Sequence, residues 1–531
     1  RDRVAALAAA APMRRGQLEV SGFAGPALAA LEDDGASVEG ARQWLELRRR
    51  VREAEALVPV VPPGLRAALR PYQVEGFAWL ARLAAWGAGA CLADDMGLGK
   101  TVQALALLLH RAGEGPALVV APTSVGFNWA REAERFAPGL RVRAYRGPQR
   151  EAALEGAGAG DVIVTSYDLM TRDRAELAAV AWHTVVLDEA QAIKNAATGR
   201  ARAAFALRAD FRLALTGTPL ENHLGELWSL LRFLLPGLLG SAAHFREAFV
   251  RPILAGDRLA QGRLARVLTP FVLRRTKAAV AQDLPPRVEV TLSIELSPSE
   301  HRRYQAARRA ALAGLVEGPM PEQQRRVKVL TALTRLRQLA CHPRLVDAGA
   351  PATSAKLEAL RALVDELRGE GNRALIFSQF VRQLVLVRDA LEADGATVLM
   401  LDGGTPVARR AEVVDAFQRG DADVLLISLT AGGTGLNLTA ASYVIHLDPW
   451  WNPAVEDQAT ARAHRIGQTQ PVTIYRLVAR GTLEERVLAL HADKRALMAG
   501  VLEGAGAAAG LRTEELVALI EAGGGSEGGQ D

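Results

Sequence analysis

Cysteine and long apolar runs are scarce in this sequence, and both shortages limit the classes of protein to which it can belong. Only Cys91 and Cys341 occur among its 531 residues, each within an apolar stretch. Two isolated cysteines give no disulfide framework and no zinc-binding spacing, so we interpret both as buried thiols. No apolar run approaches the roughly 20 residues that a membrane-spanning helix needs. These absences argue against a disulfide-stabilised secreted domain and against a membrane protein, and we expect a cytoplasmic location.

The sequence also carries little net charge. Lys and Arg number 64 against 59 Asp and Glu, a formal net charge of +5, although the isoelectric point is about 9.4. Such a basic isoelectric point permits a polyanionic partner without requiring one. Hydrophobic residues make up 49 % of the chain, which is ordinary for a globular protein with an ample core. The length predicts roughly three to four domains.

The strongest chemical signal is residues 94–101, Asp-Asp-Met-Gly-Leu-Gly-Lys-Thr. A short apolar run at 90–93 precedes it, and a helix-forming stretch at 102–110 follows it. A glycine-containing turn between a strand and a helix directs free N–H groups and the positive end of the helix dipole at one point. Lys100 adds a charge for the β- and γ-phosphates of a nucleotide, and the Thr101 hydroxyl is a ligand for Mg²⁺. The pattern therefore predicts a P-loop.

This P-loop departs from the usual pattern at one position, because Asp94 stands where the first glycine is expected. A chance structural turn is the alternative interpretation of the loop alone. The remaining motifs of the chain make that alternative weaker.

Short apolar runs alternate with helical patterns in two separate regions, from Leu69 to about Leu235 and again from Lys356. This alternation is typical of buried parallel strands with helices on both faces. Polar residues follow the runs at 117–120, 162–164, 185–187 and 213–215, where an open α/β sheet binds its ligands. The predicted strands are residues 90–93, 117–120, 162–164, 185–187 and 213–215, then 374–377, 398–401, 424–427, 444–447 and 472–475. We therefore expect an α/β fold with two parallel sheets.

These patterns divide the chain into five predicted parts. They are an amino-terminal helical segment (1–65), a first lobe (66–235), a helical protrusion or linker in which the strand pattern is lost (236–350), a second lobe (351–500) and a tail (501–531). The glycine-rich end of the tail, residues 523–531, is expected to be disordered.

A second acidic motif, Asp188-Glu189-Ala190-Gln191, follows the apolar run at 185–187. This placement predicts a Walker B motif, in which Asp188 holds Mg²⁺ through its water shell and Glu189 polarises the attacking water. An Asp-Glu pair alone is more often a solvated helix start. The apolar run before it and the P-loop upstream favour the catalytic interpretation.

Arg462 and Arg465 are spaced i, i+3, so we expect both to project from one helical face. Two guanidinium groups facing a phosphate site suit charge stabilisation in phosphoryl transfer. The alternative is a basic surface stripe.

Four motifs in this order closely resemble those of the Swi/Snf-type ATPases of helicase superfamily 2. They are residues 95–101, 188–191, 215–222 (Leu-Thr-Gly-Thr-Pro-Leu-Glu-Asn) and 464–468 (His-Arg-Ile-Gly-Gln). The resemblance covers about residues 66–500. It implies two tandem RecA-like P-loop lobes with helical protrusions, ATP and Mg²⁺ as cofactors, and double-stranded DNA as partner.

The resemblance also implies roles for individual residues. The implied catalytic residues are Lys100, Asp188, Glu189, Gln191, Arg462 and Arg465. The implied nucleotide contacts are Gln73, Asp95, Met96, Gly97, Leu98, Gly99, Lys100, Thr101, Gly435 and Gln458, with Thr101 and Asp188 serving Mg²⁺. The implied DNA contacts are Thr123, Asn128, Trp129, Ser166, Tyr167, Thr218, Arg274, Arg275, Lys277, Gln379, Thr430 and Trp451.

Some of these positions have open alternatives. Gln191 stands where the family more commonly has histidine, and we expect it to take over the hydrogen bonding between the lobes. For Trp450, beside Trp451, core packing is an equal alternative. The Arg274-Arg275 pair, as a bare sequence, is more often a solvated face.

The resemblance implies an ATP-dependent translocase on double-stranded DNA that remodels protein–DNA complexes, in a compact, bacterial-type enzyme associated with the nucleoid. RNA polymerase or another DNA-bound protein is the expected target. A strand-separating helicase is the first alternative, although no segment indicates the wedge that it needs. A non-catalytic nucleic-acid scaffold is the second, and Lys100, Glu189, Arg462 and Arg465 argue against it.

Overall fold

The computed structural model describes most of the chain as two folded units. The described residues are 13–14, 17–18, 21–24, 42–123, 126–217, 224–281, 284–316, 321–429 and 436–490. Those up to residue 281 belong to the first unit, and those from residue 284 belong to the second. The predicted tail and part of the predicted amino-terminal segment lie outside the described residues. No described helix is long and apolar enough to cross a membrane.

The first unit is built on a seven-stranded parallel sheet with the strand order β5-β6-β4-β7-β8-β3-β9. Its strands are β3 (Ala90–Leu92), β4 (Ala117–Ala121), β5 (Arg141–Ala144), β6 (Asp161–Ser166), β7 (Ala181–Asp188), β8 (Arg208–Leu215) and β9 (Val272–Leu273). All five strands predicted for the first lobe are confirmed. Strands β5 and β9 were not predicted, because both lie at sheet edges and neither is a continuous apolar run of useful length.

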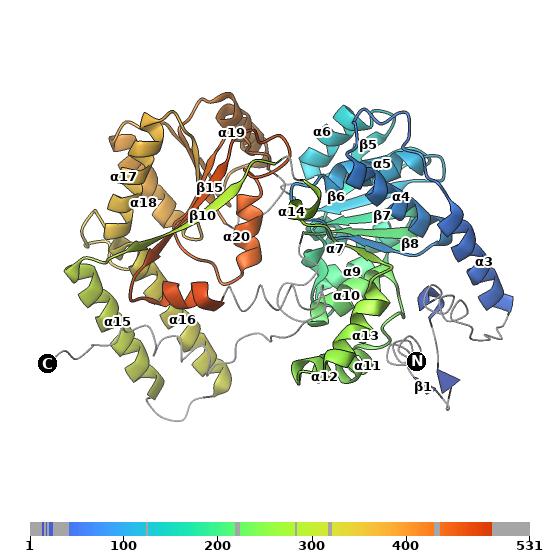
Figure 1. Ribbon diagram of the computed structural model, residues 1–531, viewed down its shortest axis with the longest axis horizontal. Coiled ribbons are helices and arrows are strands. Elements are labelled where there is room, and N and C mark those ends of the chain that lie inside the picture. The colour runs from blue at the N-terminus through green and yellow to red at the C-terminus, as the bar shows by residue number, and fades with distance from the viewer. Residues whose placement is uncertain are drawn as a thin grey trace. The chain divides into compact units, whose positions relative to one another are not determined.

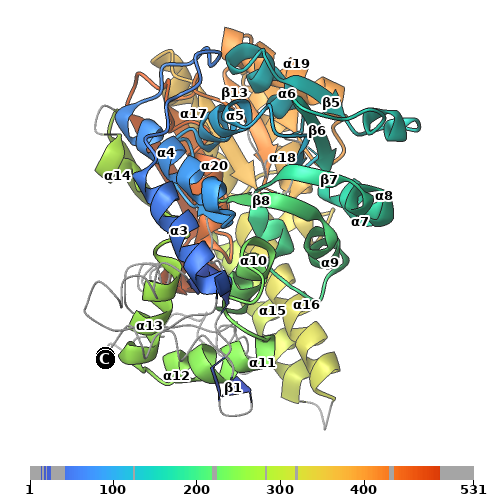
Figure 2. The same ribbon diagram turned by 90° about the vertical axis from the view of Figure 1, so that its right-hand side faces the viewer.

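Helices cover both faces of this sheet (Figures 1 and 2). They include α4 (Pro71–Trp86), α5 (Lys100–His110), α6 (Gly126–Phe136), α7 (Tyr167–Arg172), α8 (Arg174–Ala179), η3 (Ala190–Ile193), α9 (Gly199–Ala206) and α10 (Leu224–Leu234). Helix α5 contacts α4 and α6 in one layer, whereas α9 contacts α7 and α10 in the other. The unit also contains α3 (Arg42–Ala56), which packs on α4, and the short helices α11 (Ala242–Phe245), α12 (Arg251–Leu254), α13 (Arg258–Leu268) and α14 (Lys277–Val280).

The second unit has a six-stranded parallel sheet with the order β10-β15-β14-β11-β13-β12. Its strands are β10 (Arg287–Ile294), β11 (Ala374–Ser378), β12 (Val398–Leu401), β13 (Val424–Ser428), β14 (Tyr443–His446) and β15 (Val472–Ala479). Its helices are α15 (Pro298–Val316), α16 (Glu322–Cys341), α17 (Ala355–Gly369), α18 (Val381–Ala393), α19 (Val407–Arg419) and α20 (Pro453–Thr460), and residues 483–490 are also helical. All five strands predicted for the second lobe are confirmed.

The expectation that residues 236–350 contain no strand is wrong. Strand β10 lies in this segment and pairs with β15 along its full length of eight residues. It is an edge strand whose residues are all exposed or half-buried, and its sequence Arg-Val-Glu-Val-Thr-Leu-Ser-Ile has no continuous apolar run. The chain therefore passes from the first unit to the second within this segment rather than at its ends.

A buried ion pair fixes the start of α17 in the second unit. The Lys356 ammonium donates to both carboxylate oxygens of Glu484, at 2.7 and 2.8 Å, and to the Leu447 carbonyl at 2.8 Å. Both side chains are 1 % exposed. Burial disfavours the charged lysine, but Glu484 together with Cys341 and Asp448 outweighs it, and the pKa of Lys356 is raised above its ordinary value. The pair joins three segments that are far apart in the sequence.

We expect Lys356→Met to destabilise the second unit by about 3–5 kcal/mol, because it leaves the Glu484 carboxylate buried without its cation. Urea unfolding measures the loss, and hydrogen exchange of peptides from β14 and β15 localises it. Arg361→Met is the control, since the Arg361–Asp394 pair lies at the surface and exposed pairs contribute little. Equal losses in the two variants would contradict this account.

Candidate active site

The loop between β3 and α5 has the geometry of a phosphate-binding turn. Gly97 and Gly99 have φ values of 87° and 76°, in the left-handed region that favours glycine. A Cβ atom on Gly99 would also approach Gln73 Nε2 to 2.4 Å. Helix α5 begins directly after this turn, at Lys100, and runs for 11 residues. The amino end of α5, with its free N–H groups, therefore faces the loop and suits an anionic phosphate.

Lys100 is held by the main chain of the loop. Its ammonium donates to the carbonyl oxygens of Asp94 at 2.6 Å and Asp95 at 3.4 Å. Burial lowers the pKa of Lys100, and the carboxylates of Glu189 and three aspartates oppose that shift. Thr101 follows on the first turn of α5, half-buried. These two residues fit the binding of a nucleotide phosphate and its Mg²⁺.

Asp188 lies at the carboxyl end of β7 with both oxygens engaged. Trp129 Nε1 of α6 donates to Oδ2 at 2.8 Å, and the Glu189 N–H donates to Oδ1 at 3.0 Å. The Tyr167 hydroxyl of α7 donates to the Asp188 carbonyl at 2.8 Å. Burial raises the pKa of Asp188 above its ordinary value and the pKa of Tyr167 well above its own. Helix α6 thus orients the Asp188 carboxylate, and helix α7 holds its main chain.

The predicted DNA contacts of Trp129 and Tyr167 do not fit these positions. Their side chains are only 1 % and 3 % exposed, and their polar atoms bind Asp188. Both residues support the acidic motif from inside the first unit.

Glu189 has a strained backbone and a well-defined side chain. Its φ is +50°. Among the described residues, every other residue with a positive φ is a glycine. Such a conformation costs about 1–3 kcal/mol and persists where the surroundings enforce it, often at functional sites. Gln191 Nε2 donates to Glu189 Oε2 at 2.8 Å, and Gln191 Oε1 accepts from Thr216 Oγ1 at 3.0 Å. Gln191 therefore links Glu189 to the residue after β8, within the first unit.

Gln73 braces the P-loop from the start of α4. Its Oε1 accepts from the Arg70 N–H at 2.9 Å, and its Nε2 donates to the Leu98 carbonyl at 3.0 Å. The neighbouring Tyr72 hydroxyl donates to the same carbonyl at 2.9 Å. Adenine recognition by Gln73 stays a prediction.

Arg275, predicted to contact DNA, instead pairs with Asp94, the first residue of the P-loop. Its side chain is 11 % exposed, and that of Asp94 is fully buried. The sequence contained a sign of this pair, because Asp94 replaces a glycine of the P-loop pattern and a buried carboxylate needs a cation such as Arg275. Arg274 and Lys277 on either side are half-buried.

In the second unit, the two predicted catalytic arginines lie just beyond α20. The helix ends at Thr460 and residues 461–467 form turns, so the expectation that both arginines share a helical face is wrong. Arg462 is 4 % exposed and lies over the Phe377 ring at 6.0 Å. Arg465 is half-buried and donates to the Leu436 carbonyl at 3.4 Å.

Two neighbours of these arginines fix the turn, and the sequence analysis gave neither a role. His464 Nε2 contacts the Pro285 carbonyl at 3.0 Å. Gln468 Nε2 contacts the carbonyls of Ala441 at 2.9 Å and Ala463 at 3.2 Å. These contacts give a structural reason for the His and the Gln at the two ends of the motif at residues 464–468.

Arg337 of α16 organises the predicted DNA-facing residues of the second unit and was missed by the sequence analysis. It donates to Gln379 Oε1 at 2.9 Å and to the Pro449 carbonyl at 2.6 Å. Its guanidinium also lies 5.6 Å from the Trp450 ring and 5.3 Å from the Trp451 ring. The sequence did contain a sign of this role, because Arg337 falls on the apolar helix face that Leu333, Leu336 and Leu339 define.

The remaining predicted residues are dispersed. Thr123 is exposed, and Asn128 and Gln458 are half-buried. The Ser166 hydroxyl caps α7 by accepting from the Leu169 N–H at 3.2 Å. Thr218, Thr430 and Gly435 lie outside the described residues.

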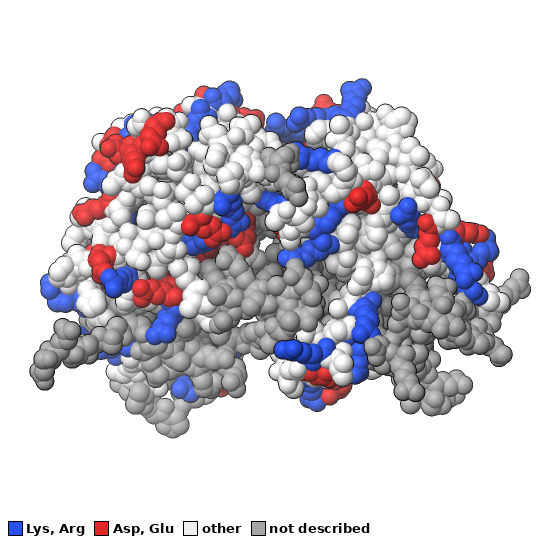
Figure 3. Space-filling model, in the orientation of Figure 1, with Lys and Arg blue, Asp and Glu red and all other residues white. Residues whose placement is uncertain are grey.

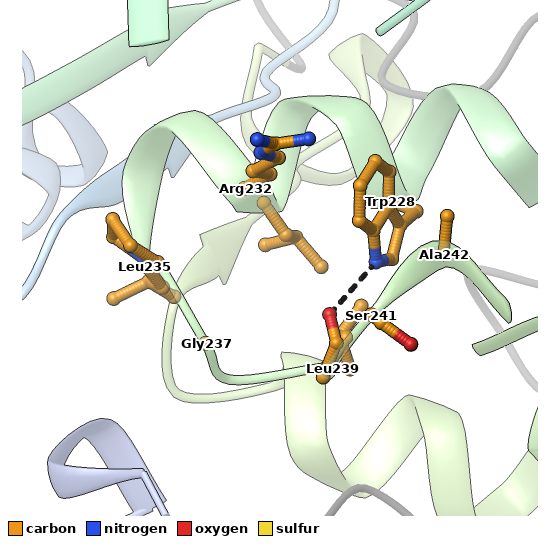
Figure 4. A pocket seen from close by; sticks show the side chains of 10 residues that line it. Trp228, Arg232, Leu235, Gly237, Leu239, Ser241 and Ala242 are labelled. Atoms are coloured by element: carbon orange, nitrogen blue, oxygen red, sulfur yellow. Dashed lines mark hydrogen bonds between the residues drawn. The ribbon is translucent and has the colours of Figure 1, made fainter. Parts of the chain in front are cut away.

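A separate hollow of about 360 Å³ lies at the end of α10 (Figure 4). Trp228 lines it and donates to the Gly240 carbonyl at 3.2 Å. The guanidinium of Arg232 lies over the Trp228 ring at 5.3 Å and the Phe205 ring at 4.7 Å. The residues that line this hollow include no second cation and no carboxylate, so it does not resemble a nucleotide site.

Charges of both signs are interspersed on the face of the molecule in Figure 3. Within the described ranges, no group of three or more His, Cys, Asp or Glu side chains is arranged to hold a metal ion. Any Mg²⁺ at the P-loop would therefore depend on Thr101, Asp188 and the phosphates of the nucleotide, the sparse protein ligation that this ion favours.

Comparison with known proteins finds matches over most of the chain. Residues 72–345 match the SNF2-related domain, and residues 355–467 match the helicase conserved C-terminal domain. The Bacillus subtilis (strain 168) protein YwqA, whose name assigns it to the ATP-dependent helicases or translocases, is 40 % identical over 92 % of this chain and 54 % of its own length. A Mus musculus SWI/SNF-related regulator of chromatin, subfamily A member 1, is 38 % identical over 79 % of this chain and 42 % of its own length.

The chain thus spans about half the length of these curated relatives. Among solved structures, the Sulfolobus solfataricus SWI2/SNF2 ATPase core in complex with double-stranded DNA is 36 % identical over 88 % of this chain and all of that one. The TM-score of that pair is 0.45.

Replacing Trp129 by Phe removes the indole N–H from Asp188 and keeps most of the buried volume. We expect the affinity for ATP with Mg²⁺ to fall about tenfold, because a hydrogen bond to a charged group contributes roughly 1.5–3 kcal/mol. Affinity measured by titration calorimetry without Mg²⁺ should change little.

Trp182→Phe is the matched control for this prediction. Trp182 is also 1 % exposed and donates its indole N–H to the Leu177 carbonyl at 2.8 Å, away from the site. A similar loss of Mg²⁺-dependent affinity in both variants would mean that Trp129 acts through packing alone.

Proposed function

The chain belongs to the SNF2-related family, and on that premise we propose that it is an ATP-dependent translocase on double-stranded DNA that remodels protein–DNA complexes. The observation that carries this proposal is the arrangement of Lys100, Asp188 and Glu189 at the carboxyl ends of β3 and β7. This edge of an open α/β sheet is where such folds bind their ligands.

In the proposed reaction, the amino end of α5 and Lys100 bind the phosphates of ATP. Thr101 and Asp188 would hold Mg²⁺, which would supply positive charge to the phosphates. Glu189 orients the attacking water and accepts its proton. Gln191 restricts the Glu189 carboxylate through the 2.8 Å hydrogen bond, so the base is oriented before substrate binds.

We further propose that Arg462 and Arg465 stabilise the charge that develops on the transferred phosphoryl group. The support comes from their residue type and their fixed surroundings, because His464 and Gln468 hold the turn that carries them. Arginines in this role are worth on the order of 10³ to 10⁵ in rate. Hydrolysis would then require the two units to close, and a duplex that favours closure would stimulate it.

Double-stranded DNA is the proposed partner. The name of the Sulfolobus solfataricus core includes double-stranded DNA, and the basic isoelectric point of this chain is compatible with a polyanion. Several of the candidate contacts are exposed or half-buried in the described residues: Thr123, Asn128, Ser166, Arg274, Lys277, Gln379 and Trp451. Phosphate contacts of this kind carry little sequence information, so the motor would track many sequences. RNA polymerase or another DNA-bound protein of the nucleoid would be displaced.

A strand-separating helicase remains the second candidate, because the name of YwqA includes both activities. The two differ in what happens to the duplex, since a helicase must insert a wedge between the strands and a translocase keeps them paired.

Replacing Glu189 by Gln should leave ATP affinity within about threefold of the native value, since Lys100, Thr101 and Asp188 are unchanged. Turnover should fall by about 10² or more, because the water loses its general base. Binding of a fluorescent ATP analogue and release of phosphate measure the two effects. Glu176→Gln, at an exposed position on α8, is the matched control and should behave as the native protein. Comparable turnover in Glu189→Gln would assign the base to another residue.

The translocase proposal is tested with four ATPase assays and two strand assays. Hydrolysis should be stimulated most by duplex DNA, compared with no nucleic acid, single-stranded DNA and RNA. Binding should be weakly sequence-dependent and should weaken steeply with salt, because it releases counterions from the phosphates. ATP should drive displacement of the third strand from a triplex, while a forked duplex stays paired. Unwinding of the fork without triplex displacement would favour the helicase instead.

A further inference from the structure

The segment that follows β9 continues a backbone ladder into the P-loop. The N–H groups of Cys91 and Ala93 donate to the carbonyls of Phe271 and Leu273, at 2.8 and 2.7 Å. The ladder then passes the end of both strands, because the Asp95 N–H donates to the Arg275 carbonyl at 2.9 Å. The Lys277 N–H returns a bond to Asp95 Oδ2 at 3.0 Å. Residues 271–277 are thus joined to the first residues of the loop that binds phosphate.

The Arg275 side chain strengthens this connection with a two-pronged ion pair. Its Nε donates to Asp94 Oδ1 at 2.9 Å, and one terminal nitrogen donates to Asp94 Oδ2 at 2.5 Å. Its other terminal nitrogen donates to the Tyr72 carbonyl, and its guanidinium lies 5.1 Å from the Tyr72 ring. Paired N–H donors on a carboxylate give a strong and geometrically specific contact.

Asp94 transmits this contact to Lys100. Its carboxylate binds Arg275, while its main-chain carbonyl accepts from the Lys100 ammonium at 2.6 Å. Gln103 of α5 binds both partners, since its Nε2 donates to Asp94 Oδ2 at 3.3 Å and its Oε1 accepts from Arg275 at 2.9 Å. The Arg275–Asp94 pair therefore holds the beginning of the P-loop against α5, the helix that follows the loop.

We propose that Arg275 is a positioning residue for nucleotide binding, which acts through Asp94 to keep the Lys100 ammonium available to phosphate. This inference rests on the proposed function and extends it to a residue whose predicted role was DNA contact. Arg275 neutralises a fully buried carboxylate that lies next to the phosphate-binding lysine. Without Arg275, the Asp94 carboxylate would still attract the Lys100 ammonium, with which it interacts electrostatically. An ammonium held by that carboxylate is a poorer ligand for phosphate.

If Arg275 acts through its charge on Asp94 and not through packing, a second substitution at Asp94 should restore the affinity for ATP. Arg275→Gln leaves the Asp94 carboxylate uncompensated, and we expect the dissociation constant for ATP to rise about tenfold or more. Asp94→Asn in the same chain removes the competing charge, so the double variant should return to within about threefold of the native constant. Arg275→Lys keeps the charge but lacks the planar fork, and should lie between the native protein and Arg275→Gln.

The experiment measures binding of a fluorescent ATP analogue and DNA-stimulated phosphate release for the full chain and these variants. Thermal unfolding of each variant reports on folding, and Arg263→Gln on α13 is the matched control for loss of an arginine from the first unit. At saturating ATP, turnover of Arg275→Gln should approach that of the native protein, since the acidic motif is intact.

Two outcomes would overturn the positioning role. One is an unchanged dissociation constant in Arg275→Gln, and the other is a weakened constant that the double variant does not restore. Failure of the proposed function looks different, because ATP binding and its rescue would persist while duplex DNA neither stimulates hydrolysis nor is tracked in the triplex assay. A native chain that binds no ATP would overturn both.

Discussion

The position of the Lys100 ammonium depends on the backbone path of residues 94–99, and the site of the first unit is built around that path. Two glycines with positive φ turn the chain so that the Asp94 carbonyl meets Lys100 at 2.6 Å. Helix α4 braces the turn through Leu98, and Arg275 braces it through Asp94. A turn of this kind has few apolar contacts of its own, so polar contacts from neighbouring elements must hold it in place.

Buried charges perform a similar task in the second unit. Arg476 of β15 donates to Glu456 of α20 at 2.9 Å and to Glu289 of β10 at 2.6 Å, and Glu456 also accepts from the Trp450 N–H at 2.8 Å. Removing such charges from water costs several kcal/mol per ion, and apolar replacements are often no less stable. We interpret these networks, with the Lys356–Glu484 pair, as devices that fix geometry between α20, the edge of the sheet and the arginine-bearing turn.

The candidate active site itself is costly to the fold. Burial raises the pKa of Asp188 and lowers that of Lys100, so both groups are less readily charged than they would be in water. Glu189 adds a strained backbone with φ 50°. Groups arranged for phosphoryl transfer commonly lower the stability of the fold, because the substrate and metal that interact with them bind only after folding. The orientation of Asp188 by Trp129 and of Glu189 by Gln191 fits that interpretation, since both bonds exist before substrate binds.

The sequence by itself determined ten of the strands, because each is a predominantly apolar run of the kind that a parallel sheet buries. It also determined the P-loop and the acidic motif, whose chemistry depends on neighbouring residues in the chain. Only the tertiary structure decided that β10 completes the second sheet, since an edge strand with one exposed face leaves a weak pattern. Only the tertiary structure decided that Arg275 belongs to Asp94 and Trp129 to Asp188, at 2.9 and 2.8 Å. Those pairs are separated by long stretches of chain, and a buried polar group chooses its partner by proximity in space, which local sequence does not encode.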